Sequence, residues 1–248
     1  MAVFFDIPSG SGGGSGWTTE GIATNTEPNG AITVTGTSIK NYAFYSKPIT
    51  SVTALNCTTV GISSFRETSI DEINPTNFPL LNAADTYSFT VNKSTFKRVY
   101  ITASSSNILG KLYVCRDNNN GLQVARFPNC TGAGNQYTFG GCYNLKLVDY
   151  GKATSFGANA FNNARALQVL ILRSTTMIPL SNVSVFTNTP LRGYNSLSAV
   201  VYVPSSLKSS YESATNWSTL VADGHTSFAN LEGSAYENTD FDDSAFIS

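Results

Sequence analysis

Phenylalanine recurs along most of the chain, and this recurrence constrains the fold more than any other feature. The residues concerned are Phe44, Phe65, Phe89, Phe139, Phe161 and Phe186. They are separated by 21, 24, 50, 22 and 25 residues, so the interval of 50 equals two units with one phenylalanine missing. Each phenylalanine follows a small or β-branched residue and precedes an apolar residue by five to seven positions. Self-similarity at this period is typical of a solenoid, in which stacked units share one continuous core.

A short segment rich in β-forming residues follows each phenylalanine and its apolar partner. The segments are residues 51–53, 71–73, 98–101, 146–148 and 168–172. Upstream, an apolar residue often stands five positions before the phenylalanine, as at Ile39, Val60 and Phe156. We therefore expect a mainly β protein with short helices, built as a solenoid with one short strand in each repeat of 21–25 residues.

One unit, at about residues 97–122, departs from this pattern because it has no phenylalanine at the expected place. It carries Leu109, Leu112 and Val114, and a turn is expected at residues 117–121. The turn resembles a calcium loop only superficially, because Pro128 stands where the bidentate glutamate belongs. Regular stacking is therefore expected to be interrupted here.

The character of the sequence changes after the last repeat. Residues 197–204 predict a strand that Pro204 ends, and the following residues place Leu207, Tyr211 and Ala214 at helical spacing. We expect this short amphipathic helix to cover the open end of the stack, with Trp217 as its largest apolar contact. The last residues are acidic with interspersed aromatic side chains, which indicates either a mobile tail or a second docking peptide.

The chain begins with an apolar peptide on a flexible tether. Val3, Phe4, Phe5 and Ile7 precede a Gly/Ser run at residues 9–16, so we expect them to anchor the domain to another protein. The alternatives are that the phenylalanines fold back onto the domain, that they are disordered, or that the run is a cloning remnant. The peptide has no Lys or Arg and is too short for a secretory signal, so we expect a route other than the usual export.

These features divide the chain into five parts. We expect an N-terminal anchor peptide with a Gly/Ser linker, a lead-in, the repeats, a C-terminal cap and an acidic tail. Their respective bounds are 1–16, 17–31, 32–195, 196–231 and 232–248.

Composition argues against several classes of function. Charged residues make up 12% of the chain and the net charge is −1, so no basic stripe exists to bind nucleic acid. No apolar run is long enough for membrane insertion. The chain has one histidine, and no two of its cysteines form a C-x-x-C pair, so we expect neither a metal nor a cofactor. Cys57, Cys115, Cys130 and Cys142 are expected to be small buried hydrophobic residues, with one disulfide as the alternative.

The residue types needed for catalysis are present but not in a catalytic pattern. His225 lies beyond the capping helix without a nucleophile elbow, and we expect it in an exposed loop. Asp71 and Glu72 are neighbours in one expected strand, so they should point to opposite faces, and Asp149 is isolated. We expect no catalytic residues. Exposed Tyr, Asn and Thr between repeats would either bind glycans by stacking and hydrogen bonding or simply cover the surface.

Several segments resemble the BspA-type leucine-rich repeat. Its pattern of an Ala-Phe pair, a Cys or Asn turn and a Leu is matched at residues 43–44, 139–145 and 159–161. Residues 167–174 are similar to the last full unit of that family, and residues 201–217 look like its closing segment. The resemblance is specific over residues 130–220 and looser over 32–129. It implies a leucine-rich-repeat horseshoe or short solenoid, and adhesion rather than catalysis.

The family occurs on bacterial cell surfaces and in the appendages of bacteriophages, and this suggests a function. We expect a non-enzymatic virion protein, either a head decoration or fibre or a tail appendage, attached to other virion proteins through its N-terminus. It would be a homo-oligomer displayed on the virion surface, with a host glycan or protein as ligand. The alternatives are a bacterial cell-surface adhesin and, third, a glycan-active enzyme.

Overall fold

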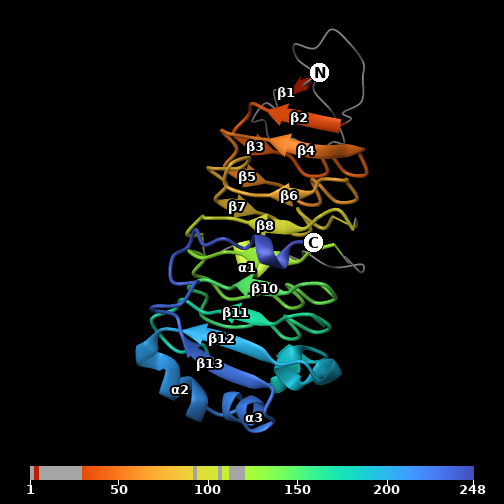
Figure 1. The fold of residues 1–248 in the computed structure, drawn as a ribbon. Helices are drawn as coiled ribbons and strands as arrows, with labels where there is room; N and C mark the ends of the chain where they lie inside the picture. The colour runs from red at the N-terminus through yellow and green to blue at the C-terminus, as the bar shows by residue number, and fades with distance from the viewer. Residues whose placement is uncertain (1–2, 6–29, 92–93, 106–107, 112–120) are drawn as a thin grey trace.

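The computed structural model describes residues 3–5, 30–91, 94–105, 108–111 and 121–248, and these residues form one stack of coils. The chain winds from the N-terminal to the C-terminal end of the stack, and each coil contributes one strand to the same side (Figure 1). The expected mainly β solenoid with short helices is therefore confirmed. No helix of the described part is both long and apolar enough to span a bilayer.

A wall of parallel strands forms one side of the stack. Seven strands follow one another in chain order in a single sheet: β6 (Glu72–Ile73), β8 (Arg98–Tyr100), β9 (Val124–Arg126), β10 (Leu147–Asp149), β11 (Val169–Ile171), β12 (Ala199–Val203) and β13 (Thr226–Asn230). A second sheet of β1 (Val3–Phe5), β2 (Gly30–Val34) and β4 (Ile49–Thr53) continues the wall towards the N-terminal end (Figure 1). The strands predicted after the phenylalanines are all present, whereas β1, β2, β9 and β13 of the wall were not predicted.

A second, shorter parallel sheet lies across the core from this wall. It consists of β3 (Ser38–Ile39), β5 (Thr59–Val60) and β7 (Ala83–Ala84), which pair in parallel. Ile39 and Val60 are buried and Phe156 is partly buried against the core, which confirms these three apolar residues as core contacts. An isolated bridge between Ala133 and Ser155 continues the same position into later repeats.

The phenylalanines form a continuous stack within each half of the solenoid, and all six are fully buried. We call these stacked rings the phenylalanine ladder, or simply the ladder. Phe65 stacks on Phe44 with 5.2 Å between ring centroids and on Phe89 with 5.9 Å. Phe161 stacks on Phe139 at 5.4 Å and on Phe186 at 5.2 Å. The backbone N–H groups of Phe44, Phe65, Phe139 and Phe161 donate to carbonyls of the next coil, as from Phe44 to the carbonyl of Ser64 at 2.9 Å. The turns are therefore joined by hydrogen bonds as well as by apolar packing.

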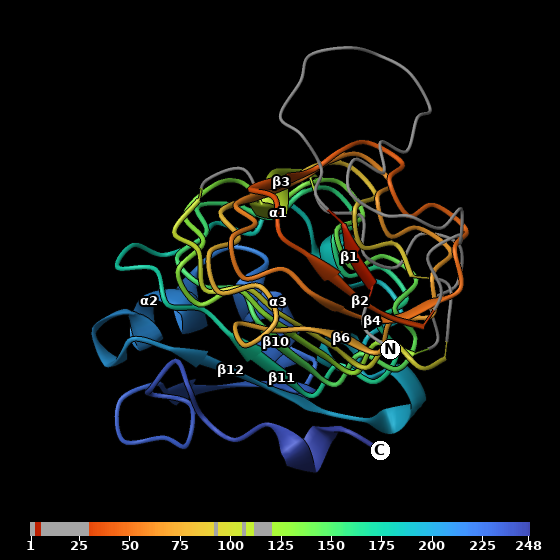
Figure 2. The same cartoon turned by 90° about the horizontal axis from the view of Figure 1, so that it is seen from above.

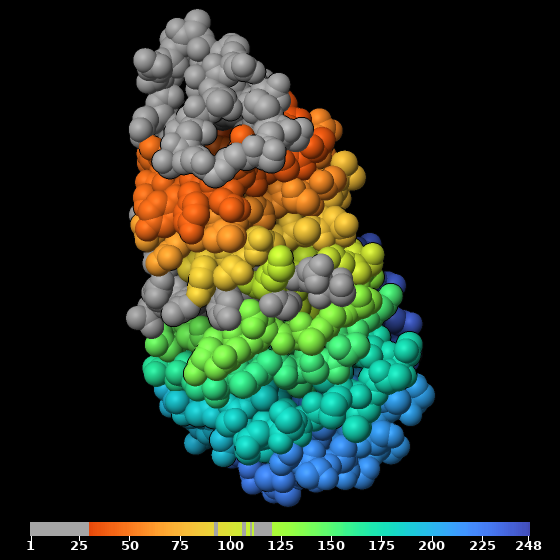
Figure 3. All heavy atoms as spheres, turned by 180° about the vertical axis from the view of Figure 1, so that it is seen from behind, coloured from red at the N-terminus to blue at the C-terminus, as the bar shows by residue number. Residues whose placement is uncertain are grey.

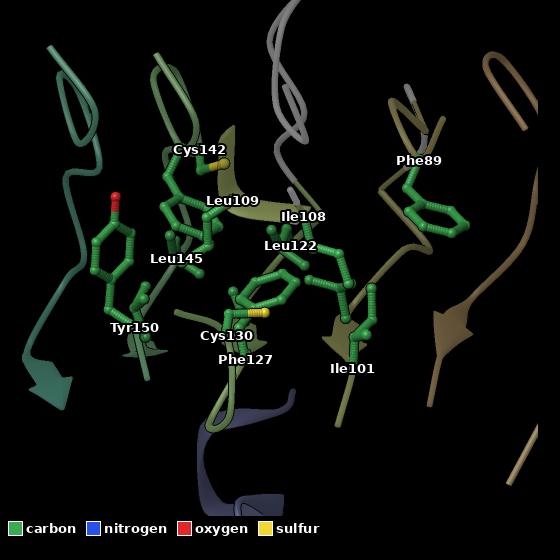
Figure 4. Close-up of a cluster of buried hydrophobic side chains, with 14 of the residues drawn as sticks. Phe89, Ile101, Ile108, Leu109, Leu122, Phe127, Cys130, Cys142, Leu145 and Tyr150 are labelled. Carbon is green, nitrogen blue, oxygen red and sulfur yellow. The ribbon is translucent and has the colours of Figure 1, made fainter. Parts of the chain in front are cut away.

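Aliphatic residues fill the core where the phenylalanine is missing. The helix α1 (Ile108–Lys111) lies beyond β7, and its Ile108 and Leu109 are fully buried with Leu122 and Phe127 between the two halves of the ladder (Figure 4). The Leu109 carbonyl accepts a hydrogen bond from the next coil at 3.1 Å, so α1 takes the place of a short strand. The turn expected at 117–121 lies, except for its last residue, outside the described residues, as do Leu112 and Val114.

The C-terminal end of the stack is closed by helices and a final strand. Three 3₁₀ segments, η1 (Val183–Phe186), η2 (Pro190–Arg192) and η3 (Tyr194–Ser196), lead into β12. The closing elements are η4 (Ser205–Leu207), α2 (Lys208–Ser213) and α3 (Trp217–Ala222), which return the chain to β13. Trp217 is fully buried against Phe186 and donates from its indole nitrogen to the Ile178 carbonyl at 2.9 Å. The predicted cap is present, but its helix is interrupted before Trp217, at Asn216, whose φ is 67°.

The cysteines do not all follow the expectation of simple buried residues. Cys57 and Cys130 are free and fully buried, as predicted. Cys142 is disulfide-bonded, so for this residue the alternative holds. Cys115 lies outside the described residues.

Candidate binding surfaces

The outer face of the strand wall is the first surface to consider, and its C-terminal part is covered by the chain itself. Residues 232–248, here called the C-terminal segment, run back across the sheet on the side opposite to β3 and α1 (Figures 1 and 2). Outward-facing apolar residues of the sheet form a separate cluster with aromatic residues of this segment. The members are Val124, Leu147, Val169, Ile171, Tyr202, Leu231, Tyr236, Phe241, Phe246 and Ile247. The segment therefore docks on its own sheet rather than extending as the mobile tail considered above.

Arginines of successive coils hold the C-terminal segment in place. Arg126 is 4% exposed, and its guanidinium lies between the rings of Tyr100 and Phe241, at 4.1 and 3.9 Å from their centroids. It donates to the Phe241 carbonyl at 3.0 Å and pairs with Asp243 at 2.8 Å. Arg98 of β8 also pairs with Asp243, at 2.5 Å. One buried carboxylate of the segment thus bridges two neighbouring coils.

A second buried ion pair lies further along the same face. The Arg173 Nε atom lies 2.8 Å from Asp149 Oδ2, and the same guanidinium donates to the carbonyls of Tyr236 at 2.7 Å and Glu237 at 2.8 Å. Burial raises the pKa of the Asp149 carboxyl, while the Arg173 guanidinium acts in the opposite direction. Because Asp149 is fully buried and paired, it has a structural role in this arrangement.

The end of the segment is fastened by side chains of β-wall residues. The Gln123 side-chain oxygen accepts a hydrogen bond from the Ser248 backbone N–H at 2.7 Å. Its side-chain nitrogen donates to the Ser248 hydroxyl at 2.9 Å. The Lys146 ammonium donates to the Phe246 carbonyl at 3.0 Å. The strand wall is consequently closed as a ligand surface between β8 and β12, and this closure was missed from the sequence.

An open pocket of about 370 Å³ lies where the segment ends, and it contains the other two acids considered as catalytic candidates. Asp71 and Glu72 both line it, together with Lys97, Arg98, Ser244 and Ile247. The expectation that the two acids are neighbours in one strand was wrong, because Asp71 precedes β6. Glu72 is paired with Arg98 at 3.1 Å and accepts a hydrogen bond from Asn74 at 2.6 Å.

His225 is likewise engaged in packing. It immediately precedes β13 and is half-buried, so the fully exposed loop expected for it was wrong. Its ring lies so close to Gly193 that a Cβ at Gly193 would sit 2.5 Å from His225 Nε2. No three His, Cys, Asp or Glu side chains come together as metal ligands in the part of the chain that the structure describes.

The phenylalanine turns form a second surface, at the edge of the stack where the strands begin. In the first three of these turns, aromatic and charged side chains adjoin one another; we call Tyr42, Tyr45, Arg66, Glu67 and Tyr87 the tyrosine edge. Tyr42 is 57% exposed and meets Tyr45 edge-on at 6.2 Å between centroids. The Arg66 guanidinium lies 5.9 Å from the ring centroids of both Tyr45 and Tyr87. The Tyr45 hydroxyl donates to Glu67 Oε1 at 3.1 Å.

A tyrosine beyond the break in the ladder is held in a similar way. Tyr137 is 42% exposed, and its hydroxyl lies 3.2 Å from the Asn159 side-chain nitrogen, which donates to it. A Cβ at Gly140 would sit 2.8 Å from the Tyr137 ring, so glycine at this position leaves room for the ring. From the sequence alone these tyrosines look like ordinary surface residues, because their grouping depends on the alignment of successive coils.

The predicted N-terminal anchor residues lie at the other end of the wall. Val3, Phe4 and Phe5 form β1, which pairs in parallel with Ile32, Thr33 and Val34 of β2. Ile7 lies outside the described residues. β1 is the terminal strand of its sheet among the described residues, and whether it attaches the domain to another protein stays a prediction.

The far side of the stack shows the coils as successive layers, with the C-terminal segment visible only at one margin (Figure 3).

Comparison with known families matches the BspA type leucine rich repeat region, in six copies, at residues 37–168, 90–192 and 117–213. Among solved structures, a leucine-rich repeat protein from Bacteroides ovatus is similar at 14% identity and a TM-score of 0.45, over 82% of this chain and 54% of that one. The chain therefore spans about half the length of that protein. No curated protein matches significantly.

Proposed function

Since the chain belongs to the BspA-type leucine-rich repeat family, we propose that it is a non-enzymatic binding protein displayed on the surface of a bacteriophage particle. The binding function is proposed because one face of the protein is covered and another is exposed. One face of the solenoid is closed by the C-terminal segment, while the phenylalanine turns present exposed tyrosines in the first coils. A rigid stack of this kind supplies extended surface for recognition.

The state of the candidate catalytic residues supports binding over catalysis. Asp149 is buried in an ion pair with Arg173, and Glu72 is paired with Arg98. His225 packs on Gly193. Each of these groups already has a structural partner, so the third class considered above, a glycan-active enzyme, receives no support from them.

The N-terminus is proposed to attach the domain to other virion proteins. β1 continues the strand wall as its terminal strand, and an edge strand offers backbone groups to another chain. Val3, Phe4 and Phe5 of this strand, with Ile7 beyond it in the sequence, are the apolar residues proposed to make the attachment. A symmetric particle would carry several copies, so we propose a homo-oligomer in the assembled state.

Deletion of residues 1–16 tests the attachment. The truncated chain lacks β1, so its thermal midpoint should fall slightly, but the stack should still fold and should no longer sediment with particles. A variant with the Gly/Ser run replaced by another sequence of equal length should still sediment with particles. Truncated protein that remains on particles would contradict the anchor. Labelling of the intact chain on bacterial envelopes, and not on particles, would favour the cell-surface adhesin instead.

A further inference from the structure

We infer that the tyrosine edge is a binding site for a neutral oligosaccharide, with Tyr42, Tyr45 and Tyr87 as stacking platforms and with Arg66 and Glu67 as hydrogen-bonding partners for hydroxyl groups. This inference rests on the proposed binding function and names its ligand class. Four observations carry it: the backbone of the tyrosines, their fixed orientation, the balance of charge and the spacing of the coils.

The backbone at these tyrosines is unfavourable for the residue type. Tyr42 and Tyr87 have φ of 60°, and Tyr137 has φ of 57°, each two residues before its buried phenylalanine. The left-handed region costs energy for a bulky L residue and suits Gly or Asn, and Asn159 takes this position in a later coil with φ of 55°. Ser63 takes the same position in the second coil with φ of 52°, so the left-handed turn recurs whatever the residue and does not itself require tyrosine.

The side chains are held in place before any ligand arrives. Tyr45 is fixed by its hydrogen bond to Glu67, and its ring meets Tyr42 edge-on. Arg66 lies near the rings of two different coils, Tyr45 and Tyr87. Rigid aromatic side chains lose little conformational entropy on binding, which makes them effective contact residues.

The charges at the edge cancel, which favours a neutral ligand. Arg66 Nε lies 3.8 Å from Glu67 Oε1. The Ser46 hydroxyl donates to Glu67 and lowers the pKa of that carboxyl, so the group is ionised at neutral pH. A guanidinium beside a carboxylate offers donors and acceptors side by side, as the hydroxyl groups of a sugar ring require. The C–H faces of the same ring can stack on tyrosine.

The spacing of the coils suits a chain of linked sugar rings. Neighbouring parallel strands lie about 4.8 Å apart, so Tyr42 and Tyr87, two coils apart, are separated by about 10 Å along the stack. The platforms therefore follow the stack axis as a row. Tyr137, beyond the break in the phenylalanine ladder, takes the same position in its turn, with φ of 57°, and continues the row.

The experiment uses the full chain and an array of neutral gluco-, manno-, galacto- and xylo-oligosaccharides, with heparin and alginate as anionic probes. The best neutral oligosaccharide is then titrated against the variant Tyr42→Asn/Tyr87→Asn. Asn keeps the left-handed backbone and removes the rings, so the Kd should rise by about tenfold. The matched control, Leu80→Asn, changes a residue that is 54% exposed outside the edge and should bind like the unchanged chain.

Thermal unfolding separates a binding role from a structural one. The double variant should unfold at the same temperature as the unchanged chain or higher, because Asn tolerates the backbone. The inference would be overturned if the full chain bound no neutral oligosaccharide or preferred the anionic probes. It would also be overturned if the double variant had an unchanged Kd or a markedly lower unfolding temperature. Particle attachment does not involve these tyrosines, so the sedimentation experiment above fails or succeeds independently of this one.

Discussion

At the scale of single residues, the repeat phenylalanine determines what its neighbours can be. Its ring lies between the rings of adjacent coils, as Phe161 lies between Phe139 and Phe186. The residue before it is small or β-branched, and from Ser64 onward that residue is buried. Where that residue is Ser or Thr, its hydroxyl donates to a carbonyl of its own turn, as Thr138 does to Asn135 at 2.8 Å. The buried hydroxyl is thereby satisfied.

Replacing one phenylalanine within a continuous part of the ladder should be costly. Phe161→Ala removes a fully buried ring stacked on both sides, and we expect a loss of about 3–5 kcal/mol in the free energy of unfolding. Urea unfolding followed by circular dichroism measures this. Leu197→Ala, at a 40% exposed position, is the control and should change the stability by less than about 0.5 kcal/mol. A similar value for the two variants would mean that the ladder does not carry the core.

The free cysteines predict a dependence of stability on alkaline pH. Burial raises the pKa of the Cys57 thiol from 9.0 to about 11, and that of Cys130 to about 12. The folded chain keeps protons that the unfolded chain loses, so this contribution is fully present below pH 9 and declines as the pH rises towards these values. In Cys57→Ala the decline in unfolding free energy between neutral and alkaline pH should be smaller.

Labelling with iodoacetamide provides the direct check on burial. The two thiols, located by peptide mapping, should react in denaturant and stay protected in the native chain at neutral pH. Rapid native labelling of either one would contradict their position in the core.

At the scale of elements, the strands differ in what their outer faces carry, and the C-terminal segment explains the difference. The three residues of β9, β10 and β11 are all buried, as in strands covered on both faces. In β4, by contrast, Thr50 and Thr53 are exposed. Apolar outer positions therefore occur where the segment docks, and arginines join it to the coils.

Removal of Arg126 should release the segment without unfolding the stack. Arg126→Ala leaves the buried Asp243 with one of its two arginines and removes the contact with Phe241, and we expect a loss of about 3–5 kcal/mol. Hydrogen exchange should accelerate in residues 236–248 and stay slow around Phe161. Lys208→Ala, which breaks an exposed pair with Glu212, is the control and should cost roughly 0.3–0.5 kcal/mol. Unchanged exchange in the segment would contradict the role given to Arg126.

At the scale of the whole molecule, the stack is one continuous core that is finished differently at its two ends. The cap of α2, α3 and β13 closes the C-terminal end around Trp217 and Phe228, whose centroids are 5.6 Å apart. At the other end, β1 is added to the wall as a parallel strand. The outer layer formed by the C-terminal segment joins coils that are far apart in the chain, since Arg98 and Asp243 are separated by 145 residues.

Deletion of residues 234–248 should convert the covered wall into an aggregation-prone surface. Val124, Leu147 and Val169 would become exposed together, and an apolar patch of this kind promotes self-association. Light scattering and dye binding should both increase. The same deletion carrying Leu147→Thr and Val169→Thr should associate less, and a truncated chain that stays monomeric would show that the segment is not needed as cover.

The sequence by itself determined the repeat, its strands, its second apolar contact and the cap, because each follows from residue spacing within about one unit. The unpredicted β9 lies in the unit without a phenylalanine, where that local signal is absent. The apolar run at residues 168–172 predicted a strand, but not that its outer face would be covered. Only the tertiary structure decided that, together with the tyrosine edge, since both depend on side chains from different coils coming into line. That alignment exists only after the coils have stacked, so no local pattern encodes it.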